Sequence, residues 1–242
     1  MLLENRLLGK TIIWNGDSIC CGGSNCGSWA ERIAKANDMT FKNYAKHGGT
    51  VVDAELKTAS GNDRHSVAGT LDIMYTEHPE ADYIIIEGGT NDADLDIANV
   101  GAPKEHHPTL GVFNPNYFGE EYDVSTFCGA LESVFCRAIK YWMGKKIGYI
   151  VAQKMGTAPT VYENRRRYFD KAVEICKKWG IPYIDLWEGC YLNPNLPWMY
   201  HREKTPEENK AENIGFYIDG QHLTSRGYDL TADIIEAWLK SL

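Results

Sequence analysis

Short apolar runs alternate along this chain with segments in which apolar residues recur at helical spacing. The short runs have the length and composition of strands that are buried on both faces. We predict such strands at 11–14, 83–87, 146–151 and 181–186, with a weaker one at 40–44. The segments between them, in which apolar residues recur at helical spacing, are expected to be helices.

The clearest helical pattern lies at 125–143, where apolar side chains share one face and Gly144 is expected to end the helix. A second helix is predicted at 160–179, because Thr160 and Glu163 have the spacing of a capping box and Pro182 gives a stop signal. Further helices are predicted at 28–36, 66–76 and 225–240. Strand and helix therefore take turns, which is typical of a parallel sheet covered by helices on both faces.

Two connections are much longer than the rest, at 92–123 and 187–218. A usual connection has roughly 4 to 6 residues. Each long connection leaves the carboxyl end of a predicted strand, the edge where open α/β sheets place their ligand crevices. We therefore expect both insertions to form walls of a site. The second is aromatic, and its rings could stack on sugars, line an acyl pocket or pin the loop to the body; they are Trp187, Tyr191, Trp198 and Tyr200.

The chain has 242 residues, which suits one domain over 1–242. Its 25 basic and 33 acidic residues give a net charge of -8, so neither nucleic acid nor an anionic membrane surface is an expected partner. The amino-terminal sequence MLLENRLLGK lacks the features of an export signal, and no apolar run is long enough to span a bilayer. We expect a cytoplasmic protein, with export from a longer precursor as the alternative.

Seven cysteines are an odd number, and three of them fall on apolar helix faces as small hydrophobes: Cys128, Cys136 and Cys176. This usage favours a reducing compartment. Three more, Cys20, Cys21 and Cys26, have no second pair of ligands at zinc spacing, so buried thiols are the expectation there. We expect no metal and no cofactor.

A serine and a histidine near opposite ends of the chain suggest a hydrolytic site. Ser18 follows the first strand in Gly16-Asp17-Ser18, where the glycine allows a tight turn. Asp219 lies three residues before His222. Acyl transfer needs a nucleophile, a base and an orienting carboxylate, and these residues have those chemical roles. Each stretch taken alone is also ordinary turn or helix-cap sequence.

Two further stretches supply groups that can stabilise an oxyanion. Asn91 follows the strand at 83–87 and two glycines, so its amide can reach the sheet edge. Gly48, in the stretch NYAKHGGT, offers a backbone N–H that a substrate oxygen can approach closely. His47 adjoins it, either as a substrate contact or as a loop residue. If each stretch were only a turn or a helix cap, all four would have to meet at one sheet edge by chance. The set of four therefore favours one active site.

The four stretches occur in an order that closely resembles the SGNH, or GDSL-like, esterase and lipase family, from near Thr11 to near Tyr228. Gly16-Asp17-Ser18-Ile19 has isoleucine where the family name has leucine, and Ala45 replaces a small residue that is often glycine. Gly89-Thr90-Asn91-Asp92 and Asp219-Gly220-Gln221-His222 match further family blocks. The resemblance implies a flavodoxin-like three-layer αβα sandwich with a five-stranded parallel sheet, and ester hydrolysis by a serine triad without metal.

The expected roles follow from the chemistry and agree with the resemblance. Ser18 is the nucleophile, His222 the base and Asp219 the orienting group. The N–H groups of Ser18 and Gly48 and the amide of Asn91 would receive the oxyanion. We expect a carboxylester hydrolase that removes short, acetyl-like groups from a carbohydrate or other small molecule. The alternatives are a non-catalytic saccharide- or acyl-binding protein on the same fold and, among enzymes, a thioesterase or acyltransferase.

Overall fold

The centre of the molecule is a sheet of five parallel strands, seen in a computed structural model that describes residues 5–23, 26–57, 61–97 and 108–242. The strands lie in the order β2-β1-β3-β4-β5, which is the flavodoxin-like order. Their bounds are β1 (Thr11–Asn15), β2 (Thr40–Asn43), β3 (Tyr83–Glu87), β4 (Lys146–Val151) and β5 (Tyr183–Asp185). All five predicted strands are confirmed.

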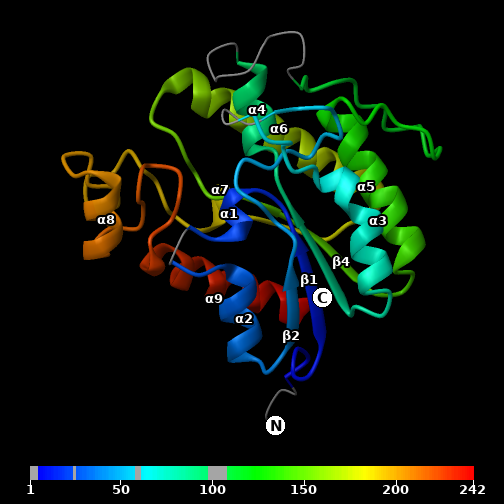
Figure 1. Cartoon of the computed structure of the whole chain (residues 1–242), viewed down its shortest axis with the longest axis horizontal. Helices are drawn as coiled ribbons and strands as arrows, with labels where there is room; N and C mark the ends of the chain where they lie inside the picture. Colours follow the sequence, from blue (N-terminus) through cyan, green and yellow to red (C-terminus); the bar gives the residue numbers. More distant parts are fainter. Residues whose placement is uncertain (1–4, 24–25, 58–60, 98–107) are drawn as a thin grey trace.

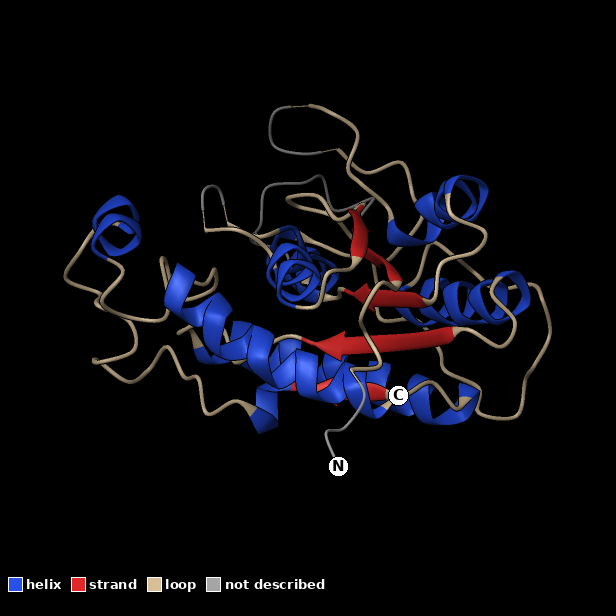
Figure 2. Ribbon diagram, turned by 90° about the horizontal axis from the view of Figure 1, so that it is seen from below, coloured by secondary structure: helices blue, strands red, loops and turns tan. Residues whose placement is uncertain are grey.

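Helices cover both faces of this sheet (Figures 1 and 2). One layer contains α2 (Trp29–Ala36) and α9 (Ser225–Ser241), which pack against each other. The other layer contains α3 (Val67–Glu77), α5 (Phe127–Tyr141) and α6 (Pro159–Trp179), with α5 between its neighbours. The predicted three-layer αβα sandwich is therefore confirmed.

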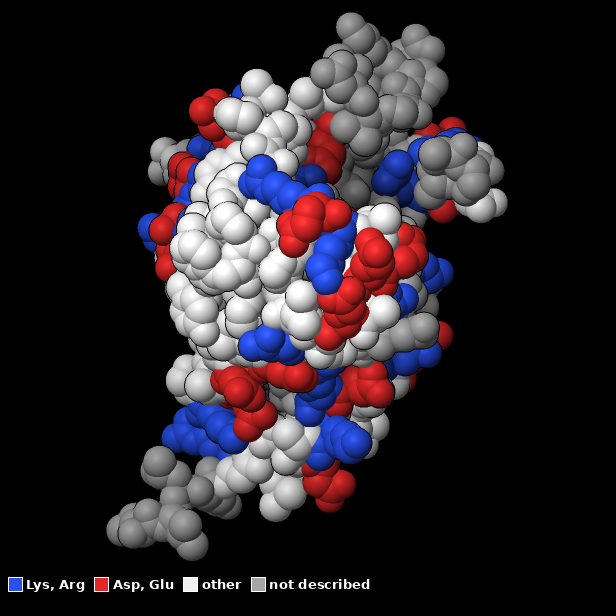
Figure 3. Space-filling model, turned by 90° about the vertical axis from the view of Figure 1, so that its left-hand side faces the viewer, with Lys and Arg blue, Asp and Glu red and all other residues white. Residues whose placement is uncertain are grey.

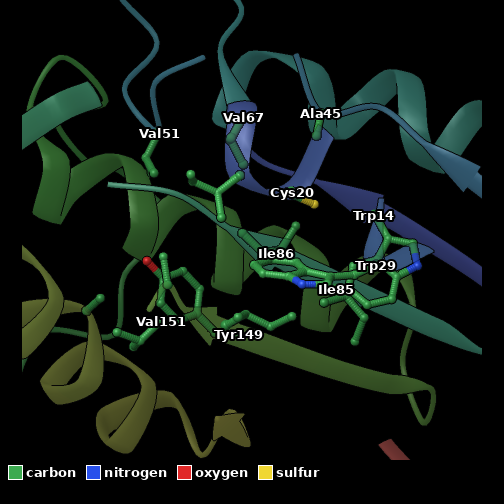
Figure 4. Close-up of a cluster of buried hydrophobic side chains, with 14 of the residues drawn as sticks. Trp14, Cys20, Trp29, Ala45, Val51, Val67, Ile85, Ile86, Tyr149 and Val151 are labelled. Atoms are coloured by element: carbon green, nitrogen blue, oxygen red, sulfur yellow. The ribbon is translucent and has the colours of Figure 1, made fainter. Parts of the chain in front are cut away.

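The continuous apolar runs of β1 and β3 have a physical reason, since alternate residues of a strand face opposite helix layers. Trp14 pairs with Ile85 across the sheet, and Trp29 of α2 packs on their side (Figure 4). The next residue, Ile86, pairs with Tyr149 on the other side, where the Tyr149 ring meets a ring of α5. These residues are buried, and the strands end together at one carboxyl edge.

The helix ends differ in detail from the sequence prediction. The prediction of a capping box formed by Thr160 and Glu163 is wrong, because α6 begins at Pro159 and has no side-chain cap. Pro159 lies in the first turn of α6, where a backbone N–H would have no acceptor within the helix, so the N–H that proline lacks is not needed. The last strand is also shorter than the predicted 181–186, since β5 begins after Pro182 and Leu186 already starts α7 (Leu186–Gly189).

The sequence pattern did not predict the short helices. These are α1 (Ser18–Cys21), α4 (Thr90–Asp96), α7 (Leu186–Gly189) and α8 (Pro206–Glu212). Each is too short to show a full apolar period, so periodicity gives no signal. Two of them begin at the candidate site, because α1 starts at Ser18 and Asn91 lies in the first turn of α4.

The two insertions have different positions. Residues 98–107 of the first insertion lie outside the described residues. The later part of this insertion packs near the carboxyl end of α6. There the Lys178 ammonium lies 5.5 Å from the ring centroid of Phe113 and 5.0 Å from that of Phe118. The Lys178 side chain is 2% exposed and pairs with Glu132. The expectation that this insertion walls the site is therefore wrong for the segment around these rings, because the buried cation attracts them.

The second insertion contains α7 and α8 and extends from the body beside the carboxyl edge of the sheet (Figure 1). Trp187 is buried against the rings of Tyr162 and Phe169, so this side chain pins the loop. Trp198 and Tyr191 are exposed. Among the described residues, no helix is both long and apolar enough to cross a membrane.

Candidate active site

Ser18, His222 and Asp219 form a continuous hydrogen-bonded chain at the carboxyl edge of the sheet. The Ser18 Oγ lies 2.9 Å from His222 Nε2, and His222 Nδ1 lies 2.7 Å from Asp219 Oδ2. Because ionised Asp219 can only accept, its partner Nδ1 carries the proton and Nε2 accepts from the Ser18 hydroxyl. Asp219 Oδ1 also accepts the backbone N–H groups of Gln221 and His222, which fixes the carboxylate.

The pKa values of this pair shift in the directions that a base and its orienting group require. Burial alone would lower the pKa of His222, but the hydrogen bond and charge of Asp219 outweigh it and leave the pKa raised. Burial would raise the pKa of Asp219, and the hydrogen bond from His222 outweighs this, so that pKa is lowered. The arrangement therefore favours the imidazolium that forms when His222 takes a proton.

The loop that presents Ser18 depends on a close approach at Gly16. A Cβ at this position would lie 2.6 Å from Glu87 Oε2 and 2.9 Å from the Cys20 Cβ. Glycine is therefore needed here for space, whereas the sequence argument invoked backbone freedom in a tight turn. Asp17 caps α1 by accepting the Ile19 N–H at 2.8 Å.

Glu87 lies directly beneath this loop and was missed as a site residue. It is fully buried, and its Oε2 accepts the Asp17 N–H at 3.1 Å. Burial, together with the charge of Asp17, raises the pKa of Glu87 well above its usual range. Glu87 therefore holds a proton to higher pH than an exposed glutamate does, and it supports the Ser18 loop. The only sequence signal was an acidic residue ending an otherwise apolar strand.

Asn91 and Gly48 lie on neighbouring segments next to the Ser18 loop. The Asn91 side-chain amide donates to the Gly49 carbonyl at 2.8 Å, and Lys46 N–H donates to the Gly16 carbonyl at 3.2 Å. Gly48 has a φ of 71°, a left-handed conformation that favours glycine. The loop after β2 thus connects the Ser18 loop with the first turn of α4.

Asp92 fastens the same loop to α4. Its carboxylate accepts the backbone N–H groups of Val51, at 2.9 Å, and Val52, at 3.2 Å. Burial raises the pKa of Asp92 to about 7, although these two N–H groups lower it in part. The residue after the candidate oxyanion donor therefore has a bracing role.

A buried guanidinium joins α4 to the loop of the candidate base. Arg165 of α6 is 4% exposed and holds Asp94 of α4 through two hydrogen bonds of 2.7 Å and 2.6 Å. Its Nη2 also donates to the Gln221 side chain at 2.7 Å, and Gln153 donates to the Gln221 carbonyl at 3.0 Å. Gln221 lies between Asp219 and His222, so this network positions both. The sequence did not indicate this role of Arg165, because an arginine among the polar residues of a predicted helix is usually exposed to solvent.

A surface cavity of about 280 Å³ adjoins the imidazole of His222. Its polar lining comes from the loop after β2, from α8 and from the base loop: His47, Glu207, Lys210, Asp219 and His222. Partial burial and the charge of His222 lower the pKa of His47, which is therefore a neutral imidazole at neutral pH. A larger cavity of about 400 Å³ lies at the opposite edge of the sheet, where β4 begins, and contains none of these residues.

Comparisons with known proteins point to the same fold. Neither a family model nor a curated protein matches the chain. A lipase/acylhydrolase from Enterococcus faecalis has a TM-score of 0.56 at 18% identity, with 96% of each chain covered. Est24, a carbohydrate acetylesterase from Sinorhizobium meliloti, has a TM-score of 0.62 at 13% identity, with 96% of this chain and 99% of that chain covered.

A third structure, of a candidate GDSL-like lipase from Bacteroides ovatus, has a TM-score of 0.55 at 16% identity and covers 97% of this chain and 99% of that one. Likeness at such identities concerns the course of the backbone. It extends over nearly the whole chain. The chain therefore has an SGNH hydrolase-like fold.

Proposed function

We propose that this protein is a serine-dependent carboxylester hydrolase that removes short, acetyl-like groups from a carbohydrate or another small alcohol. The observation that supports it best is the Ser18–His222–Asp219 chain, with its contacts of 2.9 Å and 2.7 Å. Both distances lie in the range for direct proton transfer and orientation. The fold similarity to a lipase/acylhydrolase and to a carbohydrate acetylesterase supports the same reaction class.

The first half-reaction acylates Ser18. His222 Nε2 takes the hydroxyl proton as Ser18 Oγ bonds to the acyl carbon, and the carbonyl oxygen becomes an oxyanion. The N–H groups of Ser18 and Gly48 and the Asn91 amide receive that oxyanion. Collapse of the tetrahedral intermediate breaks the bond to the alcohol oxygen, which takes the proton from His222.

The second half-reaction releases the acid. Water gives a proton to His222 Nε2 and bonds to the acyl carbon, and the second tetrahedral intermediate expels Ser18 Oγ, which regains the proton. Asp219 stays ionised and supports the imidazolium in both halves. The chain, the ester and one water molecule complete the proton balance.

Hydrolysis of p-nitrophenyl acetate by wild type and Ser18→Ala tests this proposal. We expect the substitution to lower kcat/KM at least about ten-thousand-fold, because the remaining triad members act only through the nucleophile. A Ser18→Ala variant that keeps wild-type turnover would contradict it. Wild type without any esterase activity would favour the non-catalytic binding protein instead, and transfer of the acyl group to an added alcohol in preference to water would favour an acyltransferase.

A further inference from the structure

The cavity beside His222 lies on the alcohol side of the candidate reaction. In ester cleavage the protonated base gives its proton to the departing oxygen, so the alcohol half of the substrate must lie against the imidazole. His222 and Asp219 are both among the residues that line the cavity of about 280 Å³. A group in this cavity therefore lies against the candidate base, as a leaving alcohol must.

The wall opposite His222 comes from α8, a helix in the second insertion. Glu207 and Lys210 are three residues apart on α8, which places them on one helix face, and both line the cavity. Figure 3 shows the side of the molecule toward which α8 extends, where acidic and basic side chains are interspersed. The wall therefore offers hydrogen-bond acceptors and donors together.

The α8 wall is fixed in place relative to the base loop. Thr205 and Glu208 form a capping box at its start. Asn209 is buried, and its side-chain amide donates to the carbonyls of His201, at 3.0 Å, and Ile218, at 3.1 Å. Ile218 immediately precedes Asp219, so α8 is held directly against the segment that supplies the orienting group. A fixed wall can select substrates by geometry.

The chemistry of this lining matches hydroxyl groups. Lys210 donates, Glu207 accepts, and the neutral imidazole of His47 does either. Sugar hydroxyls both donate and accept, whereas an apolar alcohol offers these side chains no hydrogen bond. The cavity volume of about 280 Å³ lies just below the usual range of small-molecule sites, roughly 300 to 1,000 Å³, which suits a group as small as one sugar ring.

We propose that the cavity between His222 and α8 is a leaving-group subsite in which Glu207, Lys210 and His47 select a polyhydroxylated alcohol, such as a single sugar unit. This inference rests on the proposed esterase function and specifies its substrate class. The selection acts through hydrogen bonds to the alcohol.

The test compares two acetate esters that differ in the leaving group. One is an acetylated methyl glucoside, and the other is p-nitrophenyl acetate, whose alcohol lacks hydroxyls to bind. We expect Glu207→Leu and Lys210→Leu each to lower the ratio of the two kcat/KM values roughly tenfold, the effect of losing one hydrogen bond to a charged group. Most of the decrease in this ratio should come from a higher KM for the sugar ester.

Lys177→Leu is the matched control, because Lys177 is exposed on α6 and does not line the cavity. Its ratio should stay within about twofold of wild type. Leucine is a strong helix former, so α8 should persist in both test variants, and circular dichroism checks that it does. An unchanged ratio in both α8 variants would overturn the subsite and leave the esterase proposal standing. Failure of wild type to cleave either ester would overturn the esterase proposal itself.

Discussion

Ser18 and His222 are 204 positions apart in the sequence, yet their side chains lie 2.9 Å apart. Local sequence explains each of them: Ser18 follows a buried strand and begins α1, and Asp219 fixes the imidazole from three residues away. Their meeting depends on the parallel sheet, which brings the carboxyl ends of its strands to one edge. At the residue scale, the pKa values of the groups around Ser18 give two predictions.

The first concerns the dependence of activity on pH. His222 must be neutral to accept the Ser18 proton, and its pKa is raised from 6.5. We therefore expect kcat/KM to rise with pH through an apparent pKa above 6.5. The contribution of the Asp219 contact to stability should be complete between 3.8 and 6.5, where Asp219 is ionised and His222 is protonated in both states, and it should be lost as pH rises through the raised pKa of His222 or falls through the lowered pKa of Asp219. A pH profile with p-nitrophenyl acetate measures the first effect, and an acid limb below 6.5 would contradict it.

The second prediction concerns Glu87. Its folded-state pKa is raised well above 4.5, so the folded protein retains a proton that the unfolded chain loses as pH rises. Glu87→Gln keeps the shape without that proton, and we expect the variant to gain stability over wild type by up to about 1.4 kcal/mol per pH unit above 4.5. Urea unfolding at pH 5 and pH 8 measures the difference. A difference that does not change with pH would show that Glu87 is ionised in the folded state.

At the scale of elements, buried polar side chains hold the four segments of the site together. Asp92 joins α4 to the loop after β2, and Arg165 joins α4 and α6 to the base loop through Asp94 and Gln221. These contacts explain how short loops keep a fixed geometry although they come from distant parts of the sequence. A site of this kind depends on such supporting contacts as much as on its reacting groups.

Replacing Arg165 should therefore affect both stability and catalysis. In Arg165→Met the nearly buried Asp94 loses its partner, and we expect a loss of about 3 to 5 kcal/mol in unfolding free energy. The charge of Arg165 lowers the pKa of His222, so the acid limb of the kcat/KM profile should also move to higher pH. In Arg165→Lys the acid limb should return part of the way to its wild-type pH, because lysine keeps the positive charge. A role of Arg165 in structure alone would not require this return.

A milder substitution keeps this prediction testable if Arg165→Met does not fold. Gln221→Met removes the side-chain contact with Arg165 but keeps the backbone bond from Gln153. We expect kcat to fall by roughly tenfold, because the base loop loses one charged hydrogen bond that positions it. Wild-type kcat in this variant would show that the network does not position His222.

At the scale of the whole molecule, the sheet and the large helices could be predicted from sequence because each contains a complete period of apolar residues. Thus β3 and α5 were expected close to their observed bounds. The short helices could not be predicted, since α8 has seven residues and no apolar face. The roles of Glu87 and Arg165 depend on burial among distant segments, which no local pattern encodes. The five residues proposed for catalysis, in contrast, lie in recognisable blocks.

The global arrangement also separates the candidate site from the larger cavity. The site lies at the carboxyl edge beside α8, while the larger cavity of about 400 Å³ lies at the other edge of the sheet. In flavodoxin-like sheets, ligands bind at the carboxyl edge where the strand order reverses, here between β1 and β3. Ser18 follows one of these strands and Asn91 the other.

Labelling with a fluorophosphonate tests the central claim most directly, because only an activated serine reacts with this reagent. We expect mass spectrometry to find one adduct, on the peptide that contains Ser18, formed at a rate that falls at least about a thousandfold in His222→Ala. Lys177→Leu should label at the wild-type rate. An adduct on another residue, or equal labelling of wild type and His222→Ala, would contradict the assignment of Ser18 and His222 as nucleophile and base.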